Sequence, residues 1–340
     1  MSELQVNSIT DTGGHTLLGR RNAIINGNFD VWQRGTSQTV SGYGSADRWR
    51  FEIGTSTQSV TQQVFALGQT DVPYNPKYYY RNVVTTGGTA SSYARLYQKI
   101  EGVGVFAGET VTLSFYAKAD ASKNIAVSFI QSFGTGGSPS SAVLGISPTT
   151  VGLTTSWAKY TVTIDVPSIS GKTLGTDDND SLGVLFWLDA GSDFNARTNS
   201  LGNQSGTFEF AQVQLEAGSV ATPFERRSYG EELALCQRYY EQIDAEVPYP
   251  FIGPATGIST IYAMAPVYYA KKRVIPSISA SGDFVLYDGA DKTASAVDLQ
   301  HTNTTRTTFR ATSSGIVAGR SYKLQFQTAG DRCIKIDAEL

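Results

Sequence analysis

Side chains of catalytic type are scarce in this chain. Its 340 residues include two histidines, His15 and His301, and neither belongs to a recognisable nucleophile–base pattern. The Gly-x-Ser-x-Gly, Walker and His-Glu-x-x-His motifs do not occur. The glycine-rich stretch 134–137 lacks the lysine and the following helix of a phosphate-binding loop, so we expect an ordinary turn there. The sequence therefore predicts a protein that is not an enzyme and has no cofactor.

The acidic run 177–180 comes closest to a calcium-binding loop. Gly183 and Asp189 follow it at the spacing of an EF-hand, but Leu182 occupies a ligand position. Residues 184–189 also have the composition of a strand rather than of a coordination loop. We expect a solvated turn and assign no metal site.

Paired carboxylates are the other chemistry to consider, because a glycosidase needs two of them about 5 to 9.5 Å apart across a sugar. Asp189 and Glu209 lie in two predicted strands and are candidates for such a pair. Scattered carboxylates on a sheet surface are more often simply solvated. A polysaccharide depolymerase remains the enzymatic alternative, and release of reducing sugar would identify it.

Sugar binding requires a flat aromatic ring for the apolar face of the sugar and polar groups for its hydroxyls. Tyr116 alternates with Phe115, and Trp187 alternates with Phe186, so both rings are expected to point away from the core. We predict that five residues line one concave sheet face as a ligand site: Arg95, Tyr116, Gln131, Trp187 and Asp189. Packing against a neighbouring subunit is the alternative role for these aromatic side chains.

The elements that position these residues are expected to be strands. Charged residues are 17% of the chain, against about 25% in typical proteins, and 34 glycines, 18 tyrosines and 16 phenylalanines suit turns and pleated strands. Alternation predicts half-buried strands at 111–118, 125–129 and 160–164, and the apolar run 182–188 predicts a strand covered on both faces. Residues 21–227 therefore form the first expected domain, an antiparallel jelly roll or β-sandwich.

One short linker helix is predicted at 228–243. Ser228 and Glu231 fit a capping box, in which each side chain satisfies an exposed backbone donor of the other residue. Four residues of the segment follow a three-four-three spacing and form an expected oligomer contact: Leu233, Cys236, Tyr240 and Ile243. The same stripe would also serve to cover the preceding sandwich, and the sequence leaves both roles open.

A second series of strand-like runs predicts a smaller C-terminal β-sandwich over residues 244–340, ending on a strand near 333–340. Its loops 287–289 and 301–303 are further candidates for recognition, although their glycine and asparagine are equally explained by turn chemistry. Residues 1–20 are polar and rich in turn formers, so we expect them to be extended and ordered only by a partner. The all-β chain thus has two sandwiches, a helix between them and an N-terminal segment.

The charge balance offers no electrostatic reason for binding nucleic acid or an anionic membrane, since 27 basic and 30 acidic residues leave a net charge of −3. No stretch approaches the roughly 20 apolar residues that span a bilayer, and residues 1–20 lack the apolar core of a secretory signal. We expect synthesis in a cytoplasm and no membrane insertion. Cys236 and Cys333 form no disulfide or zinc pattern and are expected to be buried, reduced thiols.

Several segments between residues 22 and 243 resemble a jelly-roll domain found in tail-fibre proteins of tailed bacteriophages. The matching segments are NAIINGNFDVWQR at 22–34, ADRW at 46–49, LSFYAKA at 113–119, 186–194, and the long run at 213–240. The last is the most specific, because many fixed positions occur in it together. The resemblance covers about two thirds of the chain and does not extend to the C-terminal domain.

This resemblance implies a fold similar to carbohydrate-binding modules, assembly as a homotrimer and a place in the virion tail. Residues 1–20 would attach to other tail proteins, and the C-terminal domain would be distal. The expected function is adhesion to the host through surface glycans, without cleavage. Alternatives are a tailspike depolymerase and a purely architectural fibre or capsid-decorating protein. Modules of this type often carry a structural calcium ion near their first and last strands, but no residue here identifies such a site.

Overall fold

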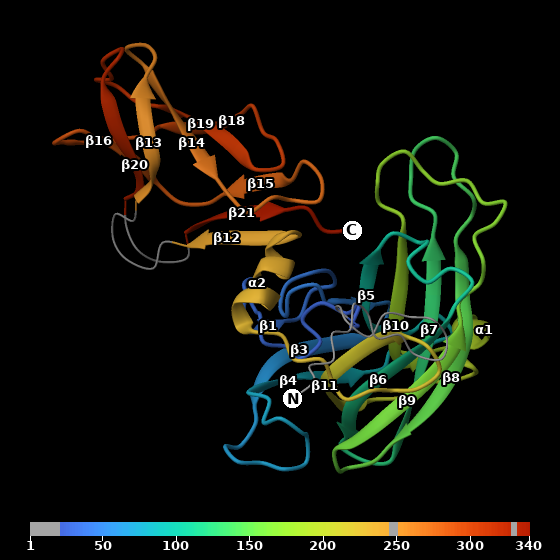
Figure 1. Cartoon of the computed structure of the whole chain (residues 1–340). Coiled ribbons are helices and arrows are strands. Elements are labelled where there is room, and N and C mark those ends of the chain that lie inside the picture. Colours follow the sequence, from blue (N-terminus) through green and yellow to red (C-terminus); the bar gives the residue numbers. More distant parts are fainter. Residues whose placement is uncertain (1–20, 245–250, 328–331) are drawn as a thin grey trace, which may run out of the picture. The chain divides into compact units, whose positions relative to one another are not determined.

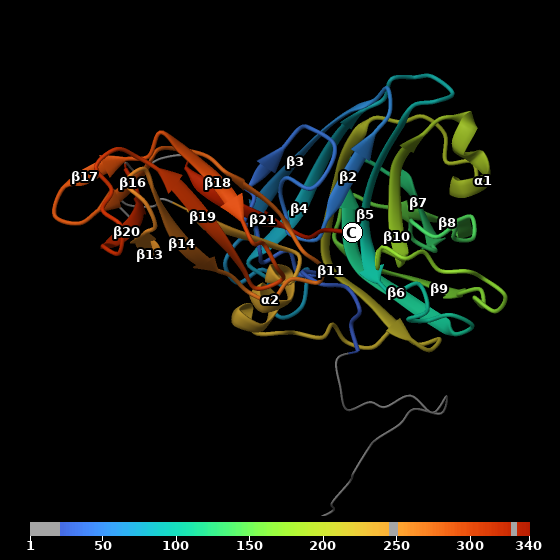
Figure 2. The same ribbon diagram turned by 90° about the horizontal axis from the view of Figure 1, so that it is seen from above.

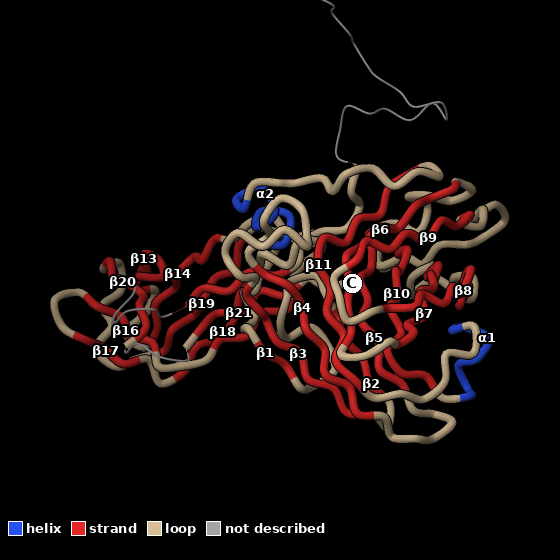
Figure 3. Tube along the Cα trace, turned by 90° about the horizontal axis from the view of Figure 1, so that it is seen from below, coloured by secondary structure: helices blue, strands red, loops and turns tan. Residues whose placement is uncertain are grey.

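The computed structural model describes residues 21–244, 251–327 and 332–340 (Figure 1). The predicted tail-attachment segment 1–20 lies outside these residues. The chain divides into two compact units: the first runs to Glu232 and includes Leu340, and the second is Leu233–Glu339. Each unit is described by itself below. Both are built almost entirely of strands, and in the described residues helix colour appears only around α1 and at α2 (Figure 3). The all-β prediction is confirmed.

Two antiparallel sheets form the first unit. Figure 2 shows the strands of the five-stranded sheet side by side, in the order β2-β5-β10-β7-β8. They are β2 Arg50–Ile53, β5 Tyr93–Glu101, β10 Ser181–Ala190, β7 Lys123–Ser132 and β8 Val143–Leu153. The six-stranded sheet has the order β1-β3-β4-β11-β6-β9. Its strands are β1 Ser37–Gln38, β3 Thr57–Val64, β4 Tyr78–Thr85, β11 Gly206–Ala217, β6 Thr110–Ala119 and β9 Ala158–Asp165.

The core of the first unit lies between the two sheets. Phe115 of β6 meets Phe186 of β10 with ring centroids 5.0 Å apart, and Phe210 of β11 lies 5.3 Å from Phe186. All three are fully buried, so the alternation that placed Phe115 and Phe186 inward is confirmed. Every residue of β10 is buried, as the continuous apolar run predicted, because a second hydrophobic cluster around Trp187 covers its other face.

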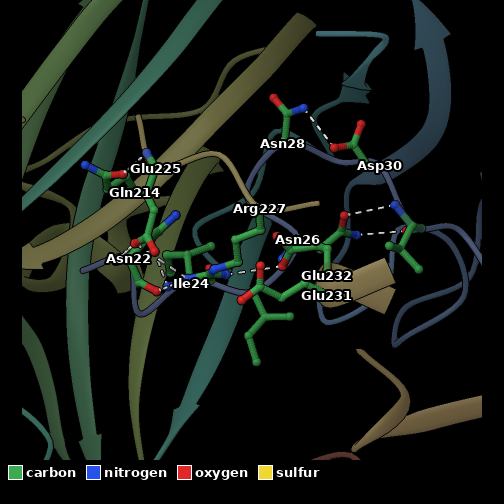
Figure 4. A network of polar contacts seen from close by, with 12 residues as sticks. Asn22, Ile24, Asn26, Asn28, Asp30, Gln214, Glu225, Arg227, Glu231 and Glu232 are labelled. Carbon is green, nitrogen blue, oxygen red and sulfur yellow. Dashed lines mark hydrogen bonds and ion pairs between the residues drawn. The ribbon is translucent and has the colours of Figure 1, made fainter. Parts of the chain in front are cut away.

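The first and last segments of this unit are locked together by buried polar contacts (Figure 4). Asn22 donates its side-chain amide to the carbonyl of Val213 (3.1 Å), and its side-chain oxygen accepts the backbone N–H of Leu215 (3.0 Å). The backbone N–H of Asn22 donates to Glu225 (2.6 Å). Gly27 completes the closure, because a Cβ at this position would lie 2.1 Å from the carbonyl oxygen of Val213.

Arg227 is the centre of this closure. Its guanidinium donates to the carbonyl oxygens of Asn22 and Ile24 and forms an ion pair with Glu232 at 3.3 Å. Glu232 in turn accepts the backbone N–H of Asn26 at 2.5 Å. The side chains of Arg227 and Glu232 are only 4% and 8% exposed. The two most distinctive sequence motifs, near residues 22–34 and 213–240, are therefore explained by closure of the sandwich rather than by a ligand.

The predicted helix starts where expected but is shorter. Helix α2 is Tyr229–Gln237, and the backbone N–H of Glu231 donates to the side-chain oxygen of Ser228 (3.3 Å), as in a capping box. The extension to residue 243 is wrong, because Tyr240–Asp244 forms strand β12. This strand pairs in register with β21, Cys333–Asp337. Backbone pairing with a strand about ninety residues later in the chain overrides the local helical spacing.

The second unit also contains two antiparallel sheets. The three-stranded sheet has the order β12-β21-β15, with β15 at Ser277–Ala280. The larger sheet has the order β17-β16-β20-β13-β14-β19-β18. Its strands are β17 Asp291–Thr293, β16 Phe284–Tyr287, β20 Ser321–Phe326, β13 Phe251–Gly257, β14 Tyr262–Tyr268, β19 Arg306–Thr312 and β18 Ala296–Gln300. Phe284, Phe309 and Phe326 are in its core. The predicted second β-sandwich with a terminal strand is therefore present, and it includes β12.

Candidate functional site

The outer face of the five-stranded sheet, turned away from the Phe186 core, carries charged and aromatic side chains in two adjacent rows. Phe51 of β2 and Leu96 of β5 point into the core, so their neighbours along each strand point outward. Glu52 pairs with Arg95, and Arg95 pairs with Trp187 on the next strand. Arg50 pairs with Tyr97 in the adjacent row. Together with two flanking tyrosines these form what we call the arginine–tyrosine ladder: Tyr43, Arg50, Glu52, Tyr93, Arg95 and Tyr97.

Glu52 is the electrostatic centre of the ladder. It accepts hydrogen bonds from Arg95, with the Nε donor at 3.0 Å, and from the hydroxyl of Tyr97 at 3.0 Å. Arg50 adds an ion pair at 2.9 Å. Burial acts to raise the pKa of Glu52, but the two arginines and the Tyr97 hydroxyl outweigh it and hold the pKa below its usual value. Burial and the charge of Glu52 raise the pKa of Tyr97, so its hydroxyl remains a donor.

The arginines are stacked among aromatic rings. The guanidinium carbon of Arg95 lies 4.8 Å from the ring centroid of Trp187, 5.2 Å from that of Tyr93 and 5.6 Å from that of Tyr97. Arg50 lies 5.7 Å from Tyr43 and 5.8 Å from Tyr97. Stacking of this kind holds a planar cation in place without using its N–H donors. The side chains of Arg50 and Arg95 keep 33% and 18% of their surface exposed, so the ladder is ordered and still reaches solvent.

Trp187 itself is fully buried beneath the ladder. Its indole N–H donates to the hydroxyl of Ser128 at 3.0 Å, and its ring packs against Phe194 at 5.4 Å and Tyr93 at 6.2 Å. Phe194 belongs to the short helical turn Ser192–Phe194, next to α1 at Asn195–Thr198. Trp187 points away from the main core as predicted, but its own chain covers it, and it presents no flat face to a sugar.

The five predicted ligand-binding residues do not share one face, so that prediction is wrong in its geometry. Tyr116 lies on β6 of the six-stranded sheet, whereas the other four lie on the five-stranded sheet. Gln131 is buried and donates to the carbonyl of Pro167 (2.7 Å). Asp189 is buried and accepts from Ser56 (2.5 Å) and from the backbone N–H of Gln204 (2.8 Å). The alternation of apolar and polar residues predicts on which side of a strand a side chain lies. It does not predict to which sheet that strand belongs.

Arg95 is the one ladder residue that the sequence analysis had named, and the other five escaped it: Tyr43, Arg50, Glu52, Tyr93 and Tyr97. The signal for part of the site was present, because Tyr93, Arg95 and Tyr97 stand two apart and must share one face of a strand. No local pattern indicates that β2 lies beside β5 and brings Glu52 to Arg95.

The glycine-rich and acidic turns, considered above as phosphate and calcium loops, meet each other. The backbone N–H of Thr135 donates to the side chain of Asn179 (2.8 Å), and the Thr135 hydroxyl donates to Asp177 (2.8 Å). The side chain of Asp180 accepts the backbone N–H of Val103 (2.7 Å). Within residues 21–244, 251–327 and 332–340, no group of three or more histidine, cysteine, aspartate or glutamate side chains is arranged to hold a metal ion.

The predicted carboxylate pair is divided between the two sheets. Asp189 is on β10 and Glu209 is on β11. Glu209 forms ion pairs with Arg81 at 2.5 Å and Lys118 at 3.0 Å. The two groups therefore do not face each other across one sheet surface, which removes the residues that had motivated a glycosidase.

The candidate loops of the second unit are held by their own polar groups. Asp288 forms ion pairs with Lys292 (2.5 Å) and Arg320 (2.8 Å), and the hydrogen bond from Lys292 is the main reason its pKa is lowered. The side chain of Asn303 accepts the backbone N–H groups of Thr305 (2.9 Å) and Arg306 (3.0 Å). These contacts are the turn chemistry that the sequence offered as the alternative to recognition.

The proposed oligomer stripe does not lie on one helix. Leu233 and Cys236 are on α2, whereas Tyr240 and Ile243 are on β12. Cys236 and Tyr240 are buried. Cys236 and Cys333 are both buried thiols outside any disulfide, as predicted. No helix in the described part of the chain is long and apolar enough to cross a membrane.

No known protein family matches the sequence, and no curated protein does. Solved structures offer distant likenesses. One described as "CBM4 structure and function" shares 19% identity over 57% of this chain and 98% of its own, with a TM-score of 0.31. A family 11 carbohydrate-binding module from Clostridium thermocellum, in complex with a mixed-linked tetrasaccharide, shares 13% over 55% and 98%, with a TM-score of 0.32.

The enzymatically active domain of tailspike protein 4 from bacteriophage CBA120 shares 14% identity over 58% of this chain, with a TM-score of 0.32. This chain spans 21% of that protein. The sandwich architecture of the present chain is established by its own strand order and pairing.

Proposed function

We propose that this protein is a non-enzymatic adhesion component of a bacteriophage tail fibre, and that its first unit binds a host-surface glycan at the arginine–tyrosine ladder. The observation that carries the proposal is the ladder itself: two arginines, a carboxylate and tyrosine rings, held in order in adjacent rows on one sheet face. Sugar sites need these two elements together, flat rings and fixed polar groups.

The ladder has hydrogen-bond donors to spare. A guanidinium has five N–H donors, and Glu52 accepts from two nitrogens of Arg95, Nε and Nη2. The remaining N–H groups suit sugar hydroxyls. Tyr43 and Tyr93 are half-buried and offer part of their rings for stacking. Arg95 positioned by Glu52 thus provides polar contacts, and the tyrosines provide apolar ones.

The placement in a virion rests on the sequence resemblance between residues 22 and 243. With it we propose a homotrimer, attachment to other tail proteins through residues 1–20 and a distal second unit. Size-exclusion chromatography with light scattering tests the assembly. A trimer of the 36.6 kDa chain is expected, and a stable monomer at micromolar concentration would contradict the proposed assembly without bearing on the ladder.

The function is tested on an array of bacterial surface polysaccharides, probed with the full-length protein and with an Arg95→Ala variant. Binding to a defined subset of glycans, lost in the variant, is expected. Each bound polysaccharide is then incubated with the wild-type protein and assayed for new reducing ends. Absence of release is expected, whereas release would establish the depolymerase alternative. If the protein binds no glycan on the array, the adhesion proposal is contradicted and the purely architectural role is favoured.

A further inference from the structure

A second cluster of aromatic rings lies on the outer face of the other sheet. Phe65 follows β3, Tyr79 is on β4 and Trp157 immediately precedes β9. Their ring centroids form a triangle with sides of 4.7 Å for Phe65–Tyr79, 5.3 Å for Phe65–Trp157 and 5.3 Å for Tyr79–Trp157. All three residues are half-buried. We call this cluster the aromatic triangle.

The triangle is not part of the packing that holds the sandwich together. None of its three residues belongs to the core cluster between the sheets or to the partly buried side chains packed against that core. Trp187 differs sharply, because it is fully buried and closes a hydrophobic cluster of its own. Three large rings that gather at the surface without filling a core are available for a partner.

Two cations stand over the rings of the triangle. The guanidinium carbon of Arg81 lies 5.7 Å from the Tyr79 centroid, and the ammonium of Lys118 lies 5.4 Å from the Trp157 centroid. Glu209 lies between them on the central strand and pairs with both. Its carboxylate is 5% exposed, whereas Arg81 and Lys118 keep 34% and 29% of their side-chain surface exposed.

Positive charge exceeds negative charge at this surface. One largely buried carboxylate faces two partly exposed cations, so the group has a net charge of +1 at neutral pH. Lys159 on β9, opposite Tyr116 in register, adds a further exposed cation to the same face. Rings with exposed cations beside them suit a sugar that carries a carboxylate or a phosphate, because the ring takes its apolar face and the cations take its charge.

We propose that the aromatic triangle, with Arg81 and Lys118, is a second saccharide-binding site, and that it takes acidic oligosaccharides. It lies on the opposite outer face of the sandwich from the ladder and does not require the ladder to bind sugar. A protein with sites on both faces would bind a polymeric surface glycan at two points, which raises its avidity without strengthening either site.

The test is calorimetric titration of the full-length protein with two matched pairs of probes. Oligogalacturonate is compared with its uncharged methyl ester, and sialyllactose is compared with lactose. At least one acidic probe is expected to bind, and its uncharged counterpart to bind about tenfold more weakly or not at all. Binding of an acidic probe is also expected to weaken as salt is added.

Two variants locate the binding. Trp157→Ala removes a ring and is expected to weaken the acidic probe about tenfold. Lys118→Gln keeps the stem of the side chain and is expected to reduce both the affinity and its salt dependence. Arg95→Ala, on the ladder, is the control and should leave acidic-probe affinity unchanged. Thermal melting of each variant shows whether it is folded before it is titrated.

Three results would overturn the proposal. One is a wild-type protein that binds neither acidic probe. Another is a folded Trp157→Ala protein with wild-type affinity for the probe. The third is loss of acidic-probe binding in Arg95→Ala but not in Trp157→Ala, which would assign the acidic sugar to the ladder instead. If Arg95→Ala loses binding on the polysaccharide array while Trp157→Ala and Lys118→Gln keep it, the ladder and the triangle bind independently of each other, as proposed.

Discussion

Replacing Arg227 with alanine is expected to release the closure between the two ends of the first unit. The side chain is 4% exposed and pairs with Glu232 at 3.3 Å. It also donates to the carbonyl oxygens of Asn22 and Ile24. Removing it leaves those carbonyls without this donor and leaves Glu232 buried without its cation. Loss of one partner from a buried pair costs about 3–5 kcal/mol, which for a unit of this size lowers the melting temperature by about 6–20 °C.

Tryptophan fluorescence isolates this effect, because all four tryptophans lie in the first unit. They are Trp32, Trp49, Trp157 and Trp187. The adjacent Arg226→Ala variant is the matched control. Arg226 lies 5.7 Å from the ring of the exposed Tyr74, and such an exposed contact is worth about 0.5–1 kcal/mol. Equal melting temperatures for the two variants would refute the assignment of Arg227 to the closure.

The pH dependence gives a second check on the same residue. Burial raises the pKa of Glu232, while the Asn26 N–H and Arg227 act against that rise. Without Arg227 the folded-state pKa rises further above the unfolded value. A group with a raised folded pKa stabilises most below the unfolded pKa and loses this contribution as pH rises through the folded pKa. The deficit of the Arg227→Ala variant should therefore be smaller near pH 4 than near pH 8, and a deficit independent of pH would contradict this electrostatic account.

Three further changes have defined outcomes in the same melting assay. Gly27→Ala should lower the melting temperature of the first unit severely or prevent folding, because its Cβ would meet the Val213 carbonyl, whereas Gly230→Ala, with open space around it, should be neutral or slightly stabilising. Trp187→Ala should cost about 3–5 kcal/mol as a core truncation, and a loss below 1 kcal/mol would contradict its burial. Glu52→Gln should destabilise at pH 7, since a lowered carboxyl pKa stabilises above the unfolded value. The stability difference between wild type and Glu52→Gln should vanish as pH falls through the folded-state pKa of Glu52. A difference that persists at pH 2 would contradict this stabilising role of the ionised carboxylate.

The sequence predicted several strands whose interior faces are apolar. Val111, Leu113 and Phe115 alternate along β6, and the structure buries them. Strands β3 and β4 were not predicted, partly because Gln58 and Asn82 turn polar side chains into the interior, where they hydrogen-bond to each other. A buried polar pair is indistinguishable from surface polarity in a single sequence, since its burial depends on two strands coming together.

The candidate site was predictable only in part, for the same reason. The alternation of residues along the strand correctly predicted that Trp187 points away from the main core. No local pattern indicated that Phe194 would pack against it. The pairing of Glu52 with Arg95 joins residues 43 positions apart. The end of α2 was misjudged because Tyr240 and Ile243 fit a helical spacing, while the pairing of β12 with β21 is visible only in three dimensions.

The most direct test of the central claim is the affinity of the first unit's ladder for the glycan selected on the polysaccharide array. Titration of that glycan compares wild type, Arg95→Ala and the control Arg226→Ala, all in the full-length protein with melting temperatures measured alongside. We expect Arg95→Ala to lose at least about tenfold in affinity, as for a charge-assisted contact, and Arg226→Ala to match wild type. A folded Arg95→Ala protein that binds the glycan as tightly as wild type would contradict the assignment of the ladder as the binding site.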